Sequence, residues 1–358
     1  MAGRRWMWVA FSIALCGCTR TPETIELSGP TMGTTYSVKI AQVPRNIEAA
    51  AVRKVIDDVL ALIDEQMSGY RSDSEISRFN QSRSIEWSPV SGELAQVVAL
   101  ALRVSDESGG ALDITVAPLV NLWGMGAEGE HAQLPTQSQI DAAREKVGSR
   151  HLSARGSPPA LRKATPELTV DLNAVAPGYA VDLLASRLEQ LGLNNFMIDI
   201  GGEIRAKGLN ADRQSWRIAI ERPADGEPEP YAIVQLKDIA VTTSGEYRHY
   251  YVRDGHRYSH TIDPRTARPV EHALASVVVI APSAFEADAW ATALNVLGET
   301  EGFALAKRRQ IPALFIVNRG GKLEPLMTAQ FPAYLAVPPA DASRGVPELP
   351  QKRAKKDD

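Results

Sequence analysis

The sequence of 358 residues is nearly without cysteine. Its only two cysteines, Cys16 and Cys18, stand near the N-terminus, before any stretch that we expect to fold. A folded region without cysteine can form no disulfide, no cysteine-ligated metal site and no thiol nucleophile. Chemistry carried out by the rest of the chain must therefore rely on oxygen and nitrogen side chains.

The chain also lacks a strong excess of charge of one sign. Its formal net charge is −4, which argues against general nucleic-acid binding because that function usually shows a basic face. The sequence contains no Walker A loop, no Rossmann glycine fingerprint and no zinc signature. A nucleotide, if one is bound, must be held in another way.

The N-terminal segment has the pattern of a targeting signal. Two arginines precede an apolar run over residues 6–15, which is too short to span a bilayer. The run ends in Leu15-Cys16-Gly17-Cys18, which resembles the lipobox of bacterial lipoproteins. We therefore expect residues 1–18 to be a signal peptide and Cys18 to be acylated, for example with palmitate. A plain secretory signal cut near Gly17 is the alternative.

The remaining chain divides into three parts. Residues 19–24 are expected to be a tether at the start of a folded domain that covers residues 19–335. Residues 336–358 are rich in Pro, Lys and Asp and poor in apolar residues, so we expect a disordered tail.

Hydrophobic spacing predicts an irregular alternation of helices and strands. The expected helices cover residues 52–63 and 93–107, or begin at Thr136, Pro177 and Ser283. The expected strands are 36–40, 195–200, 216–220, 232–236, 274–280 and 313–317. A hairpin is expected from 247–252 and 257–262, with its turn at 254–255. Hairpins mixed with helices favour an α+β fold over a regular parallel sheet.

Asp288 and Thr292 are four residues apart in the last long expected helix and so share one face. A carboxylate and a hydroxyl on one face are suitable ligands for a hard cation. An exposed, solvated pair is the alternative, but the neighbouring alanines and Trp290 argue for a buried position, where Asp288 needs a partner.

The segment 170–182 passes from a strand into a helix. Pro177 fits the first helical turn, and small residues near a helix start allow phosphate oxygens to approach backbone N–H groups. Carbonyl groups just before the helix could complete a metal site. Ordinary strand-to-helix punctuation, with Asp171 as a turn or capping residue, is equally compatible with the pattern.

His260 lies in the second strand of the expected hairpin and could accept a proton near neutral pH. A hydrogen-bonded structural histidine in a strand is the alternative. The apolar stretch 109–124 could enclose a flat aromatic ligand, with the flexible thioether of Met32 against the ring. The same stretch could instead be a core strand followed by a loop anchored by Trp123.

Six further segments stand in a fixed order along the chain: TMGT (31–34), YRSDSEISRFN (70–80), DITVAPLV (113–120), GYAVD (178–182), SHTIDPRT (259–266) and ADAWATA (287–293). Taken together and in this order, they resemble the ApbE family of FAD:protein FMN transferases, once labelled thiamine biosynthesis lipoproteins. The resemblance extends from Met32 to about Met327. It departs from the family pattern at Pro177, where many members carry Lys or Glu.

The resemblance implies an α+β fold with a T-fold-like core of mixed or antiparallel sheets and packed helices. It also implies an FAD cleft and a Mg2+ site. The residues implied to line FAD are Met32, Tyr70, Ala111, Leu112, Asp113, Asn173, Tyr179 and Ile262. The implied metal ligands are Asp288, Thr292 and the Ala176 carbonyl, an all-oxygen set that suits Mg2+ better than zinc.

The implied reaction transfers FMN from FAD to a threonine hydroxyl of an acceptor protein and releases AMP. His260 is the expected catalytic base. The implied acceptors are flavoprotein subunits of envelope redox complexes. A lipid anchor facing the periplasm would place the enzyme beside them. Family resemblance favours the inner membrane, and the outer membrane is the alternative.

Two other functions remain open from the sequence. An FAD pyrophosphatase would use water in place of the threonine and give FMN and AMP. A lipoprotein that only stores FAD is the second alternative, but storage needs neither a metal site nor His260.

Overall fold

A computed structural model describes residues 24–126, 133–224, 226–245, 250–253 and 256–337. The expected signal peptide, Cys18 and most of the expected tail lie outside these residues. Among the described residues, no helix combines the length and the apolar character needed to cross a membrane.

The centre of the fold is an eight-stranded sheet in which each strand runs antiparallel to its neighbours. Along the sheet the order is β1-β2-β6-β7-β10-β15-β16-β17. Side chains that alternate in the sequence, such as Tyr36, Val38 and Ile40 of β2, share one buried face. The strands are β1 Ile25–Thr31, β2 Thr34–Ile40, β6 Phe196–Ile200, β7 Glu203–Lys207, β10 Ile239–Gly245, β15 Leu274–Ala281, β16 Ala313–Arg319 and β17 Lys322–Met327.

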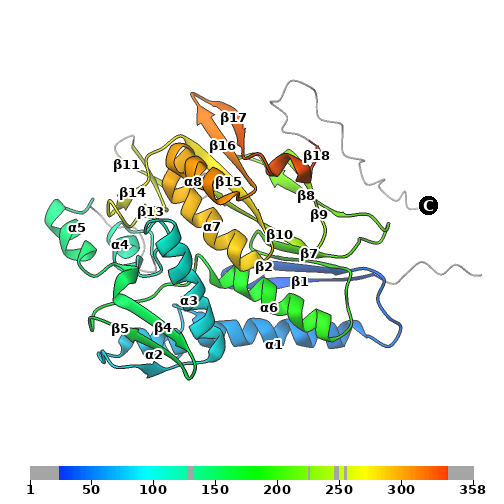
Figure 1. Cartoon of the computed structure of the whole chain (residues 1–358), viewed down its shortest axis with the longest axis horizontal. Coiled ribbons are helices and arrows are strands. Elements are labelled where there is room, and N and C mark those ends of the chain that lie inside the picture. Colours follow the sequence, from blue (N-terminus) through cyan, green and yellow to red (C-terminus); the bar gives the residue numbers. More distant parts are fainter. Residues whose placement is uncertain (1–23, 127–132, 225, 246–249, 254–255, 338–358) are drawn as a thin grey trace, which may run out of the picture.

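Three long helices cover one face of this sheet: α1 Ala49–Met67, α6 Ala176–Gln190 and α7 Ala284–Leu297 (Figure 1). Their apolar positions enter the main hydrophobic core together with the facing strand residues. In α1 these positions include Val52, Ile56, Val59 and Ile63, the spacing that predicted the helix. α7 is almost entirely buried because it lies between α6 and strands β10 and β15.

A second, smaller core lies on the opposite face of the sheet. It is closed by the three-stranded sheet of β8 Trp216–Glu221, β9 Pro230–Leu236 and β18 Leu335–Val337. β18 pairs with β9, so the strand continues two residues beyond the predicted domain limit at residue 335.

The remaining elements are shorter, and several of them lie outside the central sheet and its covering helices. A three-stranded sheet has the order β3-β5-β4, and α3 packs on it. The elements are α2 Glu75–Gln81, β3 Ser88–Pro89, α3 Gly92–Glu107, α4 Ala117–Leu122, α5 Gln137–Arg144, η1 Ser149–His151, β4 Leu152–Gly156, β5 Pro159–Lys163, β11 Tyr250–Arg253, β12 His256–Ser259, β13 Ile262–Asp263, β14 Arg268–Pro269, η2 Gly298–Gly302, α8 Phe303–Arg309 and η3 Phe331–Tyr334.

The α+β expectation, a T-fold-like core of antiparallel sheet with packed helices, is confirmed. The capping box at Thr136 and Gln139 is present, and Ser283 caps α7 by accepting from the Glu286 N–H. One local prediction is wrong. The hairpin ends at Ser259, because the chain bends at His260 and residues 262–263 pair with β14 instead. The alternative of a core strand in 109–124 is also wrong, because this stretch contains the short helix α4 and no strand. The predicted hairpin turn at 254–255 lies outside the described residues.

Candidate active site

A cavity of about 350 Å3 lies between α7, β7, β10 and the segments around residues 111–114 and 171–174. We call it the Asp288 cavity. Asp288 and Thr292 both line it, one helical turn apart on α7, and Asp288 is only 6% exposed. The alternative of a solvated pair on this helix is therefore wrong. Six other predicted residues line the same cavity: Ala111, Leu112, Asp113, Asn173, His260 and Ile262.

A larger cavity of about 710 Å3 adjoins the first, and Asn173 and His260 line both. We call it the Tyr70 cavity. Met32 and Gly33 form its β1–β2 turn; both have positive φ, which places the thioether at the cavity wall. Tyr70 is 75% exposed, a large aromatic ring left open to solvent at this cavity. Ala176, at the start of α6, also lines it.

α6 and α7 meet at Gly178. The Gly178 N–H donates to Oδ2 of Asp288 over 3.1 Å. A Cβ at Gly178 would lie only 2.7 Å from the Ala284 carbonyl oxygen and 2.8 Å from the Asp288 Cβ. Glycine is therefore required for the helices to approach closely enough to form this hydrogen bond. The contact also lies two residues after Ala176, so it brings the carboxylate towards the start of α6.

The Asp288 cavity is strongly acidic. Asp113, Asp171, Glu203 and Asp288 line it, and the described lining residues include neither Lys nor Arg. Burial, and next the neighbouring Glu203 carboxylate, raise the pKa of Asp288 well above its usual range. Burial raises the pKa of Glu203 to about 8 and also raises that of Asp171. Buried carboxylates without a cation are costly, so the cavity favours a positively charged ligand.

A magnesium ion would fit the chemistry of these residues. In the described part of the chain, no three His, Cys, Asp or Glu side chains cluster as a metal site, so a cation would need mixed oxygen ligands. Oδ2 of Asp288 accepts from the Gly178 N–H, and Asp288 and Thr292 both line the cavity. Carboxylate, hydroxyl and carbonyl oxygens are ligands suited to a hard divalent cation.

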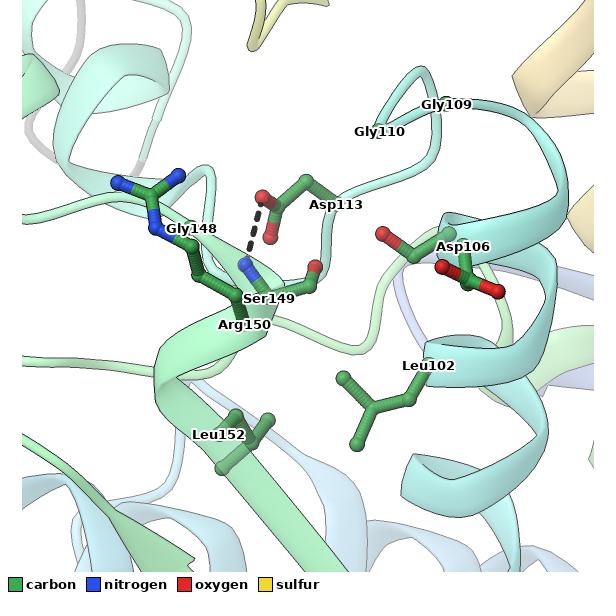
Figure 2. Close-up of a pocket in the computed structure, with 10 residues that line it drawn as sticks. Leu102, Asp106, Gly109, Gly110, Asp113, Gly148, Ser149, Arg150 and Leu152 are labelled. Atoms are coloured by element: carbon green, nitrogen blue, oxygen red, sulfur yellow. Dashed lines mark hydrogen bonds between the residues drawn. The ribbon is translucent and has the colours of Figure 1, made fainter.

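The Asp113 carboxylate accepts hydrogen bonds from its own loop and from the start of η1, and its predicted contact with FAD stays a prediction. Oδ1 accepts from the Thr115 N–H and hydroxyl, and Oδ2 accepts from the Ser149 N–H over 3.0 Å. Figure 2 shows this last bond at the edge of another cavity of about 340 Å3, which Asp113 also lines. The carboxylate therefore fixes the shape of the 111–115 segment that forms the wall of the Asp288 cavity.

Tyr179 is the one predicted FAD-lining residue that lines neither the Asp288 nor the Tyr70 cavity. It is 8% exposed in the main core, and burial raises the pKa of its hydroxyl to about 12. Its contact with FAD stays a prediction. Asp171 is both a turn residue, since its Oδ1 accepts from the Asn173 N–H, and a cavity residue.

Sequence reasoning missed Glu203. It begins β7 directly after the Gly201-Gly202 turn and reaches the Asp288 cavity from the central sheet. The sign available in the sequence was the double glycine Gly201-Gly202, which is typical of a tight hairpin turn. In the structure both glycines have positive φ in the turn between β6 and β7. The sequence alone did not show that this strand faces α7.

Comparisons with known proteins agree with this geometry. A sequence profile of the ApbE family matches residues 32–315. The FAD:protein FMN transferase of Vibrio cholerae serotype O1 is 44% identical over 93% of this chain and 99% of its own length. The FAD:protein FMN transferase of Salmonella typhimurium is 42% identical over 92% of this chain and 97% of its own length.

A solved structure of the flavin transferase ApbE from Vibrio cholerae superposes with a TM-score of 0.81. It covers 87% of this chain and 99% of that chain at 44% sequence identity. Sequence, coverage and fold agree over nearly the same residues, and the chain therefore belongs to the ApbE family.

Proposed function

We propose that this protein is an FAD:protein FMN transferase that uses Mg2+ to move FMN from FAD onto a threonine hydroxyl of an acceptor flavoprotein. The FAD:protein FMN transferase names of relatives at 40–44% identity support the activity and the use of FAD as donor. The threonine target and the release of AMP rest on the family resemblance, and the metal rests on that resemblance together with the oxygen groups of the Asp288 cavity.

One observation carries the proposal: an acidic cavity adjoins a larger cavity, and His260 and Asn173 line both. The volumes, about 350 and 710 Å3, lie in the range of small-molecule sites. FAD has two halves joined by a pyrophosphate, so the junction at His260 is the natural place for the reacting phosphorus. The pyrophosphate is anionic, and a cation between it and the acidic cavity would offset their repulsion.

In the proposed reaction the acceptor hydroxyl oxygen attacks the FMN-side phosphorus. A new phosphorus–oxygen bond forms, and the bond from that phosphorus to the bridging oxygen breaks. AMP leaves with the bridging oxygen and its electron pair, and His260 takes the hydroxyl proton. When bound, Mg2+ supplies positive charge that neutralises the charge developing on the phosphate oxygens. Asp288, Thr292 and the Ala176 carbonyl would hold it.

The rest of the site binds and orients. Ala111, Leu112 and Ile262 offer apolar surface to a flat ring, and Tyr70 offers an exposed aromatic face. The 111–115 segment is fixed by Asp113, so this wall is formed before the ligand arrives. Such preorganisation reduces the entropy lost on binding.

The proposal is tested with purified protein, FAD, Mg2+ and an envelope extract from cells that lack the gene. We expect one AMP released for each FMN bound covalently to protein, and no release when EDTA removes the metal. Release of AMP together with an equal amount of free FMN would instead indicate the pyrophosphatase. Bound but unchanged FAD would indicate storage.

We further propose that the enzyme works at the periplasmic side of the bacterial envelope, held by lipid on Cys18, on the inner membrane. The support is the N-terminal sequence pattern described above. The partners would be flavoprotein subunits of envelope redox complexes, which an anchored enzyme would meet at the membrane surface.

A further inference from the structure

The first turn of α7 is capped by a residue of another helix. Asp182 lies on α6, and its Oδ1 accepts from the Ala284 N–H over 3.0 Å while its Oδ2 accepts from the Phe285 N–H over 2.9 Å. Ser283 caps the next N–H, that of Glu286, over 3.1 Å. The first N–H groups of a helix have no partner within the helix, and a carboxylate there also stabilises the positive end of the helix dipole.

This cap and the Gly178–Asp288 bond form a matched pair. Gly178 and Asp182 are one turn apart on α6, and Ala284 and Asp288 are one turn apart on α7. The pairs are Gly178 with Asp288 and Asp182 with Ala284, so the helices run in opposite directions through two successive contacts. Two contacts fix both the separation and the sliding of α7 along α6, which one contact cannot do.

The central sheet fixes the other side of Asp182. Arg205 of β7 forms an ion pair with Oδ1 of Asp182, and both side chains are largely buried, with 25% and 16% exposed. Glu203 is two residues earlier on the same strand and so projects from the same face. Asp182 therefore joins the three elements, α6, α7 and β7, that bring Ala176, Asp288 and Glu203 to the site.

We propose that Asp182 is a positioning residue for the metal site. This proposal rests on the metal ligands named in the proposed function. Asp182 touches neither the metal nor FAD. It sets the position of α7 on α6, and thereby the distance between the Asp288 carboxylate and the Ala176 carbonyl. Loss of Asp182 should weaken Mg2+ binding while every ligand atom remains present.

Asp182→Asn removes the negative charge but keeps the size of the side chain, and Asp182→Ser keeps one short acceptor. Glu189→Gln is the matched control, because the Glu189–Lys207 ion pair of 2.7 Å also joins α6 to β7, whereas the carboxylate of Asp182 also caps α7. Asp288→Ala is measured beside them to test the metal site itself. Mg2+ affinity is measured by titration calorimetry on the metal-free protein, and the Tm of each variant by thermal unfolding.

We expect Asp182→Asn to raise the Kd for Mg2+ by about 10- to 100-fold, the usual effect of losing an outer-shell partner. Asp182→Ser, whose shorter side chain cannot reach both N–H groups of α7, should give a rise at least as large. Glu189→Gln should keep the Kd of the original protein within about twofold, well below that range. FAD binding in EDTA, followed by flavin fluorescence, should be unchanged in all three variants. Saturating Mg2+ should restore the turnover of Asp182→Asn.

Two results would overturn the proposal. In the first, Asp182→Asn and Asp182→Ser lower the Tm but leave the Kd for Mg2+ unchanged, so the residue serves stability alone. In the second, Glu189→Gln weakens Mg2+ binding as much as Asp182→Asn does, so any loosening of α6 is enough. If Asp288→Ala itself keeps the original affinity, the metal assignment fails, which is a different outcome from the other two. If Asp182→Asn does not fold, Asp182→Ser decides on the same criteria.

Discussion

The Gly178 N–H and the Asp288 carboxylate are joined by a hydrogen bond of 3.1 Å at the point where α6 meets α7. The bond requires a glycine, since a Cβ would come within 2.9 Å of the Phe285 Cα and closer still to two other atoms. The position of the buried carboxylate thus depends on a residue with no side chain.

Gly178→Ala should force α6 and α7 apart. We expect a loss of about 1–3 kcal/mol in the free energy of unfolding, the usual cost of overpacking, together with weaker Mg2+ binding. Gly92→Ala is the control, because a Cβ there has nothing within 4 Å. Urea unfolding and calorimetric titration measure both effects. Equal behaviour of the two variants would show that the helices tolerate the added methyl group.

Asp288→Ala should remove metal-dependent activity while the fold survives. Burial raises the pKa of the Asp288 carboxylate, so its charged form is costly in the metal-free protein. Removing the carboxylate should therefore lower the free energy of unfolding of the metal-free protein only a little. We expect turnover to fall on the order of 100-fold or more, as for loss of other groups that stabilise transition-state charge. Glu286→Gln, in the same helix and paired with Arg103 at the surface, is the control. Full activity of Asp288→Ala at limiting Mg2+ would place the metal elsewhere.

His260→Ala should lower turnover on the order of 10²- to 10⁴-fold with little change in FAD affinity, since general base catalysis contributes about that much. The apolar walls and the metal ligands remain in the variant. Turnover and Tm are measured on one preparation. A lower Tm with unchanged turnover per folded molecule would mean that His260 only holds the bend between β12 and β13.

The stability of the metal-free protein should depend on Glu203. Its pKa is about 8 in the folded protein against an ordinary value of 4.5, so the folded state holds the proton more tightly than the unfolded chain. Its contribution is complete below about pH 4.5 and is lost as the pH rises through about 8. The free energy of unfolding in EDTA should therefore decline over this range, and Glu203→Gln should make the decline shallower. Identical slopes in urea unfolding would contradict the assignment.

Cys18 should be the acylated first residue of the mature protein. Mass spectrometry of the membrane fraction should show a diacyl or triacyl cysteine at the N-terminus. A Cys18→Ser variant should be found in the soluble fraction. An unmodified N-terminus near Gly17 would instead support a plain secretory signal.

Much of the fold could be predicted because its periodicity is local. Val52, Ile56, Val59 and Ile63 define α1, and the residues of β2 alternate regularly. β7 was missed for a physical reason. Its charged residues Glu203, Arg205 and Lys207 share one face, and their partners come from α6 and the cavity. Only Ile204 and Ala206 alternate with them towards the second core, and two apolar residues are too short a pattern to predict a strand.

Part of the site could also be predicted from a local pattern. Asp288 and Thr292 could be paired from their spacing on one helix, a local feature. Glu203 and Asp182 act through contacts more than 80 residues away along the chain, with Asp288 and with the start of α7. Neither contact leaves a mark in the neighbouring sequence, so only the assembled fold shows them.

The most direct test of the account is to find where the flavin goes. Envelope extract from cells lacking the gene is incubated with the purified protein, FAD and Mg2+, and the flavin-fluorescent proteins are digested and sequenced by mass spectrometry. The account predicts a peptide with one FMN attached through a phosphoester to a threonine, which is absent with Asp288→Ala. Consumption of FAD with no flavin-bearing peptide, or attachment at a residue without a hydroxyl, would contradict it.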